Sequence, residues 1–258
     1  MNSMKIGFIG CGKIAEPMVR SIARRFPEAC IFVSKRSDAI STRLENQIEN
    51  VKAGNNQWVL DQSDIIVLSV LADVARKLFP SLHFRENQKM ISVMADISLA
   101  EVSDLISPAH HPCVTIPLPF IETGNCPLPV YPDSTLLEQV FGDENQIILL
   151  QSEEHMGPHF AATAILSTLM AQLNCAGNWL GNKTGSAVNG EIYVASLVSG
   201  YLNTVPKDGN SRFLEVMEDL STEGGLNTQL LNHNRNAGML AALNAGLEAL
   251  DTRLRGNG

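Results

Sequence analysis

A glycine-rich segment near the start of the chain has the residue types and spacing of a phosphate-binding turn. Gly10, Gly12 and Ala15 form a G-x-G-x-x-A pattern directly after the apolar stretch 4–9, "MKIGFI". In this pattern the first glycine allows a tight turn and the second lets the backbone approach a diphosphate. The small third residue lets a helix pack close to the preceding strand, and free N–H groups at the helix start face the anion. The pattern predicts a dinucleotide site made by Gly10, Cys11, Gly12, Lys13, Ile14 and Ala15; the alternative is a turn without a ligand.

A second group of residues bears on which dinucleotide this site would take. An acidic residue at the end of the second strand is typical of NAD sites, because a carboxylate binds the ribose hydroxyls. At that place the sequence has two hydroxyls and two cations: Ser34, Lys35, Arg36 and Ser37. These residue types suit a 2′-phosphate, which an arginine can bind through two parallel hydrogen bonds. We therefore predict NADP rather than NAD; the alternative is that Lys35 and Arg36 are only solvated surface charges.

The elements that would position these residues follow from the apolar pattern. Over residues 1–152, short apolar stretches typical of strands alternate with amphipathic segments typical of helices. The predicted strands cover 4–9, 30–34, 50–54, 64–71, 89–95, 113–120, 129–132 and 145–151. The predicted helices between them cover 13–25, 37–48, 73–80 and 98–106, the last with Ser98 as N-cap and Glu101 as its reciprocal partner. Alternation of this kind predicts a mostly parallel sheet with helices on its faces.

The remainder of the chain has a different pattern, because no strand signal follows residue 152. Helices are predicted over 157–180, 184–204, 211–221 and 225–254, with breaks at 181–182, 205–210 and 224–225. The apolar stretch 159–181 is interrupted by Thr, Ser, Gln and Asn, so we interpret it as a buried helix in a bundle and not as a membrane span. The prediction is an N-terminal α/β domain over 1–152 followed by an all-helical domain over 153–258.

Composition excludes several classes of protein. The 258 residues carry a formal net charge of −8, which argues against nucleic acid as the main partner. The five cysteines are scattered, and no Cys, His, Asp and Glu set has metal-ligand spacing, so neither a disulfide framework nor a metal site is expected. Reduced thiols and the lack of a signal-peptide pattern predict a cytoplasmic protein.

Several motifs together resemble the pyrroline-5-carboxylate reductase family. The opening "MKIGFIGCGKIAEPMVRSI" (4–22) is similar to that family's M-K-I-G-F-I-G-x-G-x-M-x-x-A-I, and "VSKRS" (33–37) is similar to its NADP-recognising turn. "SDIIVLSV" (63–70) and "ISVMADISLAEV" (91–102) resemble its A-D-V-I-I-L-A-V and I-S-I-x-A-G-I-S-L-E-x-L. "DLSTEGGLNTQLL" (219–231) resembles its V-T-S-P-G-G-T-T-I-x-G-L. Their order and spacing agree over nearly the whole chain.

The resemblance implies a fold and an assembly. It implies a Rossmann-like NAD(P)-binding domain followed by a helical dimerisation domain that interlocks two subunits, with the active site between the domains at the dimer interface. It also implies that Val70, Leu71 and Pro117 border the coenzyme. The second-domain helices are rich in Ala, Ser and Gly alongside Leu, and they would leave apolar surface exposed unless a partner covers it. We therefore predict a homodimer or a higher homo-oligomer.

The sequence departs from the family where the substrate would bind. "IPLPF" (116–120) lacks the asparagine that would face the nicotinamide, and Leu226-Asn227 replaces the paired threonines that contact substrate in the family. The candidate substrate-binding residues are Gly224, Gly225, Asn227 and Thr228, and the candidate catalytic residues are Thr222, Asn227 and Thr228. They lie at a loop-to-helix junction whose N–H groups could hold a carboxylate; the alternative is a plain helix N-terminus.

The expected reaction is hydride transfer from NADPH to a small imine or carbonyl compound. An imine can arrive already protonated, so it needs little acid catalysis, which agrees with the lack of a strong acid–base signature. A ketone would want a Lys, His or Tyr to protonate the alkoxide, and the predicted helix 157–180 has no lysine, Lys183 following it. The alternative is a non-catalytic NADP-binding sensor or scaffold with the same fold, which the missing asparagine and threonines favour.

Overall fold

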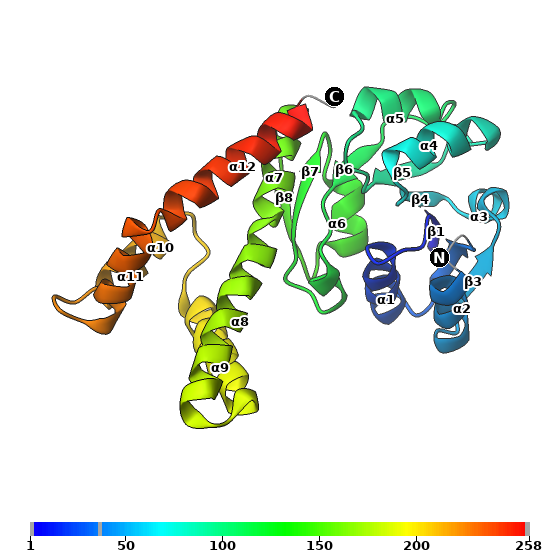
Figure 1. Ribbon diagram of the computed structural model, residues 1–258. Helices are drawn as coiled ribbons and strands as arrows, with labels where there is room; N and C mark the ends of the chain where they lie inside the picture. Colours follow the sequence, from blue (N-terminus) through cyan, green and yellow to red (C-terminus); the bar gives the residue numbers. More distant parts are fainter. Residues whose placement is uncertain (1–2, 36–37, 256–258) are drawn as a thin grey trace. The chain divides into compact units, whose positions relative to one another are not determined.

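A computed structural model of the protein describes residues 3–35 and 38–255 (Figure 1). The chain divides into two compact units, one of residues 1–160 with 251–258 and the other of residues 161–250. These units differ from the predicted division at residue 152, because residues 153–160 and the end of the last helix group with the first unit. The assignment of separate functions to the two parts stays a prediction.

The first unit is built on one eight-stranded sheet in the order β3-β2-β1-β4-β5-β6-β7-β8. All neighbouring strands are parallel except β6 and β7, which are antiparallel. The strands are β1 (Lys5–Ile9), β2 (Cys30–Ser34), β3 (Val51–Gly54), β4 (Ile65–Leu68), β5 (Lys89–Ser92), β6 (Cys113–Thr115), β7 (Pro127–Tyr131) and β8 (Gln146–Leu149). The sheet thus confirms the predicted parallel α/β architecture.

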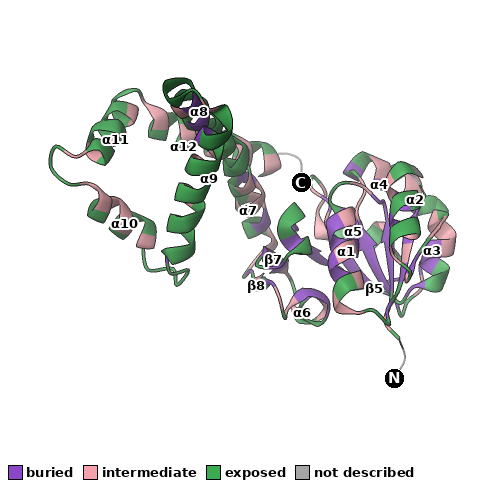
Figure 2. Cartoon of the chain, turned by 90° about the horizontal axis from the view of Figure 1, so that it is seen from below, coloured by how far each residue is buried: buried purple, intermediate pink, exposed green. Residues whose placement is uncertain are grey.

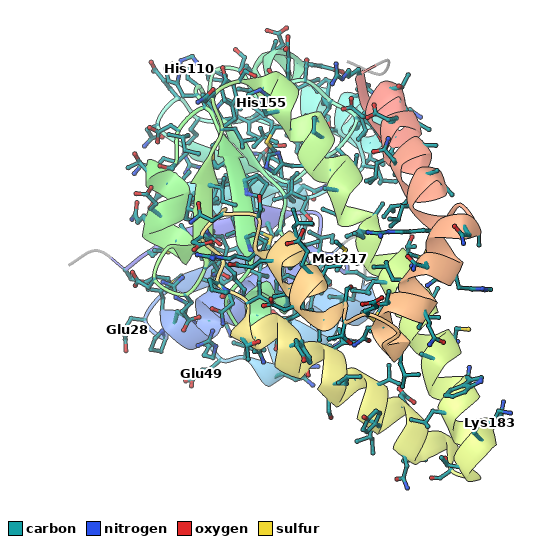
Figure 3. All side chains as sticks on the ribbon, turned by 90° about the vertical axis from the view of Figure 1, so that its left-hand side faces the viewer. Glu28, Glu49, His110, His155, Lys183 and Met217 are labelled. Atoms are coloured by element: carbon teal, nitrogen blue, oxygen red, sulfur yellow. The ribbon has the colours of Figure 1, made fainter. Side chains whose placement is uncertain are left out.

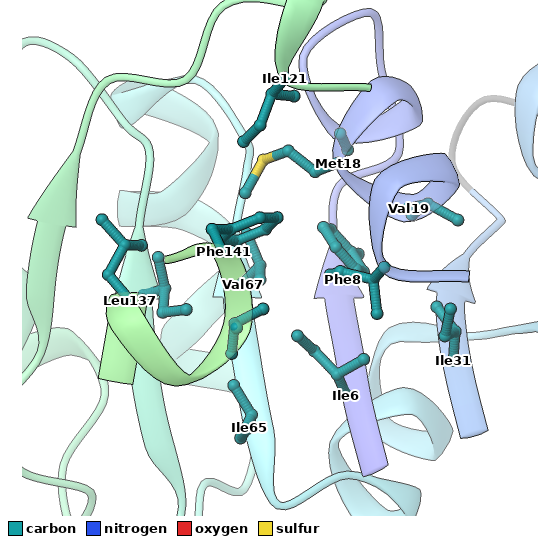
Figure 4. Close-up of a cluster of buried hydrophobic side chains, with 14 of the residues drawn as sticks. Ile6, Phe8, Met18, Val19, Ile31, Ile65, Val67, Ile121, Leu137 and Phe141 are labelled. Atoms are coloured by element: carbon teal, nitrogen blue, oxygen red, sulfur yellow. The ribbon is translucent and has the colours of Figure 1, made fainter. Parts of the chain in front are cut away.

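Helices cover both faces of this sheet. The α-helices of this part are α1 (Ala15–Arg25), α2 (Asp38–Gln47), α3 (Asn56–Gln62), α4 (Ala72–Leu78), α5 (Leu99–Leu105) and α6 (Thr135–Phe141). Side chains alternate between faces along β1, so Phe8 packs with the cluster under α1 and α6, whereas Ile9 packs with the cluster under α3, α4 and α5. Figure 4 shows Met18 of α1 and Phe141 of α6 beside Phe8 in the first cluster. Burial on both faces explains why the central strands are continuously apolar.

The second unit is helical. Its helices, together with the two that continue into the first unit, are α7 (Met156–Thr163), α8 (Ile165–Thr184), α9 (Ala187–Thr204), α10 (Arg212–Leu220), α11 (Leu226–Asn236) and α12 (Met239–Arg255). Helices α8 and α9 approach closely, since a Cβ on Gly190 would lie 2.4 Å from the carbonyl oxygen of Gly177. In Figure 2 the residues of α9 and α11 are mostly exposed, whereas buried residues concentrate in the sheet of the first unit.

Some of the predicted helix limits are wrong. The break expected at 181–182 does not occur, because α8 continues to Thr184 and ends at Gly185, whose φ of 75° suits a left-handed cap. Lys183 therefore lies in the last turn of α8 (Figure 3). Ser98 caps α5 as predicted, but the Glu101 carboxylate forms an ion pair with Arg76. The helices α3 and α6 were not predicted.

The stretch 159–181 is not a buried helix within this chain. Gly177 and Gly181 are the buried residues of α8. By length and composition the helical stretch Glu153–Thr184 is the one candidate membrane span among the described residues, with 11% of its apolar window buried. A single candidate of this kind is weak support for a span, because uncovered interface helices have the same composition.

Candidate functional site

The predicted coenzyme residues of the first unit gather at one edge of the sheet. Gly10 follows β1, Ser34 ends β2, and Val70 and Leu71 follow β4, and these three strands are adjacent and parallel. From β1 the chain runs to β2 on one side and returns to β4 on the other. Such a switch of direction leaves a crevice at the carboxyl ends of the strands, which is where open α/β sheets bind ligands.

Gly10 makes the turn that leads from β1 into α1. Its φ is 94°, and a Cβ added to it would lie 2.3 Å from the carbonyl oxygen of Ser69. Its N–H donates to the buried hydroxyl of Ser34 over 2.8 Å. Ser34 is therefore a residue that positions the turn, with its hydroxyl oxygen accepting from the backbone. Ala15, fully buried at the start of α1, lets this helix sit directly on the sheet.

Gly12 has a different surrounding from Gly10. A Cβ added to Gly12 would meet nothing within 4 Å, so its lack of a side chain leaves open space above the turn. Helix α1 starts without a side-chain cap at Ile14. Within the described residues, the N–H groups of Gly12, Lys13 and Ile14 donate no hydrogen bond, whereas Glu16 donates to the Gly12 carbonyl. The start of α1 thus offers free donors with the positive end of the helix dipole behind them.

The charged side chains beside this turn are compatible with a bound anion, because two arginines face one carboxylate. Glu16 in the first turn of α1 forms ion pairs with Arg20 and with Arg43 of α2. The Arg43 guanidinium holds the pKa of the Glu16 carboxyl below its usual range, against the opposing effect of partial burial and with help from Arg20. Because Glu16 is neutralised by two cations, its charge does not dominate the field at the helix start.

Cys11 lies inside the turn but is not a reactive group. It is 3% exposed, and burial raises the pKa of its thiol to about 12, with the Glu16 carboxylate adding to the shift. A thiol with this pKa stays protonated at neutral pH and is a poor nucleophile. The predicted contact of Cys11 with the coenzyme is therefore one of its backbone.

A cavity of about 750 Å³ opens beside the end of β2. Its lining residues come from the ends of β2 and β3 and from α4: Lys35, Asn55, Asn56, Asp73, Val74, Lys77 and Leu78. Asn55 accepts a hydrogen bond from the N–H of Trp58 over 2.8 Å, so its amide donors remain for another acceptor. Lys35 is exposed and lines this cavity, and its contact with a 2′-phosphate stays a prediction. Arg36 and Ser37, predicted beside it, lie outside the described residues.

Of the seven lining residues, the sequence analysis predicted Lys35 and missed the other six. Asn55 and Asn56 directly follow β3, so the rule that ligands bind at carboxyl strand ends could have found them. Lys77 had no comparable signal, because it lies in the last turn of α4, away from any strand end, and enters the cavity only through the packing of that helix.

The apolar residues predicted to border the coenzyme divide into two kinds. Leu71 is 77% exposed and Ile14 is 39% exposed, which is unusual for large apolar side chains outside an interface. Val70 packs against the Gly10 turn, 2.7 Å from the place of its missing Cβ. Pro117, after β6, is buried. Leu71 and Ile14 are thus the exposed members of this group, whereas Val70 packs on the glycine turn and Pro117 is buried.

A second cavity of about 650 Å³ follows the end of β5. Its lining includes the loop after β5 and the start of α7: Met94, Ala95, Asp96, Ile97, Ser98, Val114, Glu153, Glu154, His155, Met156, Gly157, Pro158, Phe160, Leu254 and Arg255. Asp96 has a φ of 58°, at the place of the family's glycine, and is 4.0 Å from Arg253. His155, labelled in Figure 3, lies just before α7 and is exposed.

The candidate substrate residues lie in the second unit, at the start of α11. Gly224 has a φ of 72°, and Gly225 caps α11 with no side-chain hydrogen bond. The Thr228 hydroxyl donates to the Thr222 carbonyl over 2.7 Å. These residues thus form the predicted loop-to-helix junction, but the hydroxyl of Thr228 is used within the turn. Asn227 is exposed.

Two features remain to be compared with the sequence: the lack of metal-ligand spacing, and Glu122, a candidate to face the coenzyme's reactive ring because it follows the proline-rich end of residues 113–120. Among residues 3–35 and 38–255, no group of three or more His, Cys, Asp and Glu side chains is arranged to hold a metal ion. The carbonyl of Glu122 accepts a hydrogen bond from Arg24, which lies in the last turn of α1. Glu122 is therefore beside the end of α1 that is remote from the glycine turn.

Fold and site together define the class of protein: a parallel α/β domain with a dinucleotide-type glycine turn, followed by a helical unit. Residues 5–96 match the family model described as NADP oxidoreductase coenzyme F420-dependent. The chain is 33% identical over 99 residues to pyrroline-5-carboxylate reductase 1 of Bacillus subtilis (strain 168). That match covers 36% of this chain and 33% of the relative, so the chain matches about a third of the relative's length.

Solved structures extend the likeness to the whole fold. Pyrroline-5-carboxylate reductase from Streptococcus pyogenes superposes with a TM-score of 0.84 at 16% identity, over 99% of this chain and 100% of the other. The Plasmodium falciparum pyrroline carboxylate reductase with NADP bound gives 0.82 at 16% identity, over 100% and 99%. A reductive aminase from Aspergillus terreus gives 0.60 at 13% identity, over 99% and 92%. The resemblance to pyrroline-5-carboxylate reductases and the fold class are thereby confirmed.

Proposed function

We propose that this protein is an NADPH-dependent reductase that transfers hydride to a C=N or C=O bond of a small molecule. The observation that carries the proposal is the start of α1, where Gly12 leaves open space beside three unused N–H groups at the switch point of the sheet. A diphosphate fits this place, because backbone donors and a helix dipole stabilise an anion there. The neighbouring cavity with Lys35 suits the adenosine end of the same ligand.

The reduced nicotinamide, when bound, supplies the hydride. The chain's own residues bind and orient the coenzyme: the turn at residues 10–15 holds the diphosphate, and Lys35 binds the 2′-phosphate. Arg36 and Ser37, which lie outside the described residues, are further candidates from the sequence. The exposed side chains of Ile14 and Leu71 would cover the apolar faces of the rings and exclude water from them. The names of the similar structures, which include an NADP complex and an NADPH-using reductive aminase, support NADP as the coenzyme.

An imine is the preferred substrate class for this reaction. An imine that arrives protonated already carries the positive charge that hydride neutralises, so no side chain has to donate a proton to it. Thr222, Asn227 and Thr228 are the candidate residues that touch it, with Gly224 and Gly225 supplying N–H groups.

The second candidate function is a non-catalytic NADP sensor or scaffold. It is favoured by the hydrogen bond of Thr228 to Thr222, which leaves one fewer hydroxyl donor for a substrate. The coenzyme site is the same in both candidates, so coenzyme binding cannot separate them, whereas turnover can.

Calorimetric titration with NADPH and NADH tests the coenzyme site, and NADPH oxidation in the presence of cyclic imines and 2-oxo acids tests the reaction. Tight binding of NADPH with turnover of at least one imine supports the reductase. Tight binding without turnover over the whole panel supports the sensor. No heat with either coenzyme rejects both.

A further inference from the structure

The cavity beside β2 contains a cation that the glycine motif and the β2 turn do not account for. Lys77 belongs to α4, which follows β4, whereas Lys35 follows β2. In the strand order β3-β2-β1-β4 these two elements lie on opposite sides of β1, yet both lysines line the same cavity of about 750 Å³. The packing of α4 therefore brings a second ammonium to the region where residues after β2 meet the ribose of a dinucleotide.

Both ammonium groups are available to a ligand. Among the described residues, neither Lys35 nor Lys77 makes an ion pair or a side-chain hydrogen bond. The one acidic residue of the lining, Asp73, is 3.0 Å from Arg76, which also pairs with Glu101. Arg76 is shared with Glu101, so it offsets the charge of Asp73 only in part. The lining is nevertheless net positive, because the two lysines outnumber its one carboxylate.

We propose that Lys77 determines coenzyme specificity by binding the 2′-phosphate of NADPH together with Lys35; this rests on the proposed function. A 2′-phosphate carries up to two negative charges and several acceptor oxygens, more than one ammonium satisfies. Lysine binds phosphate as a point charge from any direction. A cation on α4 can therefore approach the phosphate from the face opposite the β2 turn. Asn55, whose amide donors are unused, completes the polar lining.

The proposal predicts that Lys77→Gln selectively loses affinity for ligands that carry a 2′-phosphate. We expect 2′,5′-ADP to bind roughly tenfold more weakly, the lower range for a hydrogen bond to a charged group, with AMP and NADH unchanged. Lys77→Arg, which keeps the charge, should retain most of the preference. In Lys35→Gln/Lys77→Gln the preference of the protein for 2′,5′-ADP over AMP should fall further than in either single variant.

Lys89→Gln is the matched control, because Lys89 is exposed at the first residue of β5, outside the cavity, and loses the same charge. Calorimetry on the full chain, at two salt concentrations, measures all ligands. The proposal would be overturned if Lys77→Gln weakened the binding of 2′,5′-ADP and of AMP equally, or if it changed binding no more than Lys89→Gln does. Either result would still be compatible with an NADPH site in the unmodified protein. Failure of the unmodified protein to bind NADPH, NADH and 2′,5′-ADP would instead reject the proposed function, and the role of Lys77 with it.

Discussion

Gly10 and Gly12, two residues apart, are glycines for different reasons. Gly10 has a left-handed backbone and no room for a Cβ beside Ser69, so its identity is required by the fold itself. Gly12 has neither constraint within the chain, because a Cβ there would meet open space. The fold itself therefore does not require glycine at position 12, whereas the close approach of a coenzyme diphosphate to the backbone would.

These two glycines give a paired prediction. Gly10→Ala should lower the free energy of unfolding by about 1–3 kcal/mol from backbone strain alone, and further through overlap with Ser69. Gly12→Ala should leave the free energy of unfolding nearly unchanged but weaken NADPH binding. Urea denaturation and calorimetric titration measure the two quantities. A Gly12→Ala variant that binds NADPH as tightly as the unmodified protein would contradict the site.

Cysteine reactivity gives a second prediction at this scale. Cys11 is buried with a pKa raised to about 12, whereas Cys30 is exposed. Since only the thiolate reacts, iodoacetamide at mildly alkaline pH should modify Cys30 in the native protein and leave Cys11 unmodified until it unfolds. Mass spectrometry of peptides after timed labelling measures this. Rapid modification of Cys11 in the folded state would show that the turn opens.

At the scale of elements, α1 and α2 are tied together beside the coenzyme turn by Glu16. Its carboxylate pairs with Arg20 on its own helix and with Arg43 on α2. Arg43, with a smaller effect from Arg20, lowers the pKa of the Glu16 carboxyl. A lowered pKa in the folded state means that ionised Glu16 stabilises the fold above its ordinary pKa. This stabilisation is lost as the pH falls from that value through the lowered one.

Glu16→Gln should therefore lower the free energy of unfolding at neutral pH by roughly 0.5–1 kcal/mol. Below the lowered pKa, Glu16 is protonated in both states and the two proteins should have equal stability. Urea denaturation of both proteins across an acid pH series measures the difference. A difference that grows as the pH falls would contradict the assigned direction of the pKa shift.

Several elements could be predicted from the sequence and others could not. The strands β1, β2 and β4 were predicted because continuous apolar stretches between polar ones define buried parallel strands. Helices α3 and α6 have seven residues each and were missed, whereas α5, of the same length, was predicted because of the capping pattern of Ser98 and Glu101. The break at 181–182 was predicted from Gly181, but this glycine lies inside α8, where it allows α9 to approach.

At the scale of the whole molecule, the second unit lacks a core of its own. The three hydrophobic clusters of the described residues all belong to the first unit. Within residues 161–250, large apolar and aromatic side chains are exposed instead, among them Trp179 at 62% and Tyr193 at 60%. An exposed apolar surface on this scale is normally covered by a partner, which supports the predicted homo-oligomer.

Sedimentation velocity at micromolar concentration should therefore show a dimer or larger species. Replacing Tyr193 and Leu197 of α9 by lysine should shift the protein to smaller species, because charges in an apolar interface are costly. Replacing exposed Lys89 by glutamine is a control that should not change the sedimentation coefficient. A well-behaved monomer at these concentrations would contradict the prediction.

The sheet, the glycine turn and the resemblance to a reductase family could all be inferred from the amino-acid sequence, because they depend on local patterns of apolar residues and glycines. The glycine turn directly follows β1 in the chain, so the spacing of residues alone is enough to place the turn at the end of that strand. The departures of residues 116–120 and 226–227 from the family were also visible without a structure.

Two features came from the three-dimensional packing alone: which residues line the same cavity, and which hydroxyl groups form hydrogen bonds within the chain. Ser34 was predicted to face the coenzyme, but its side chain is buried and bonded to Gly10. Lys77, without any motif of its own, enters the cavity of Lys35 because α4 packs on the far side of β1. Contacts between elements distant in sequence arise from the packing of helices on the sheet, and no local spacing contains that information.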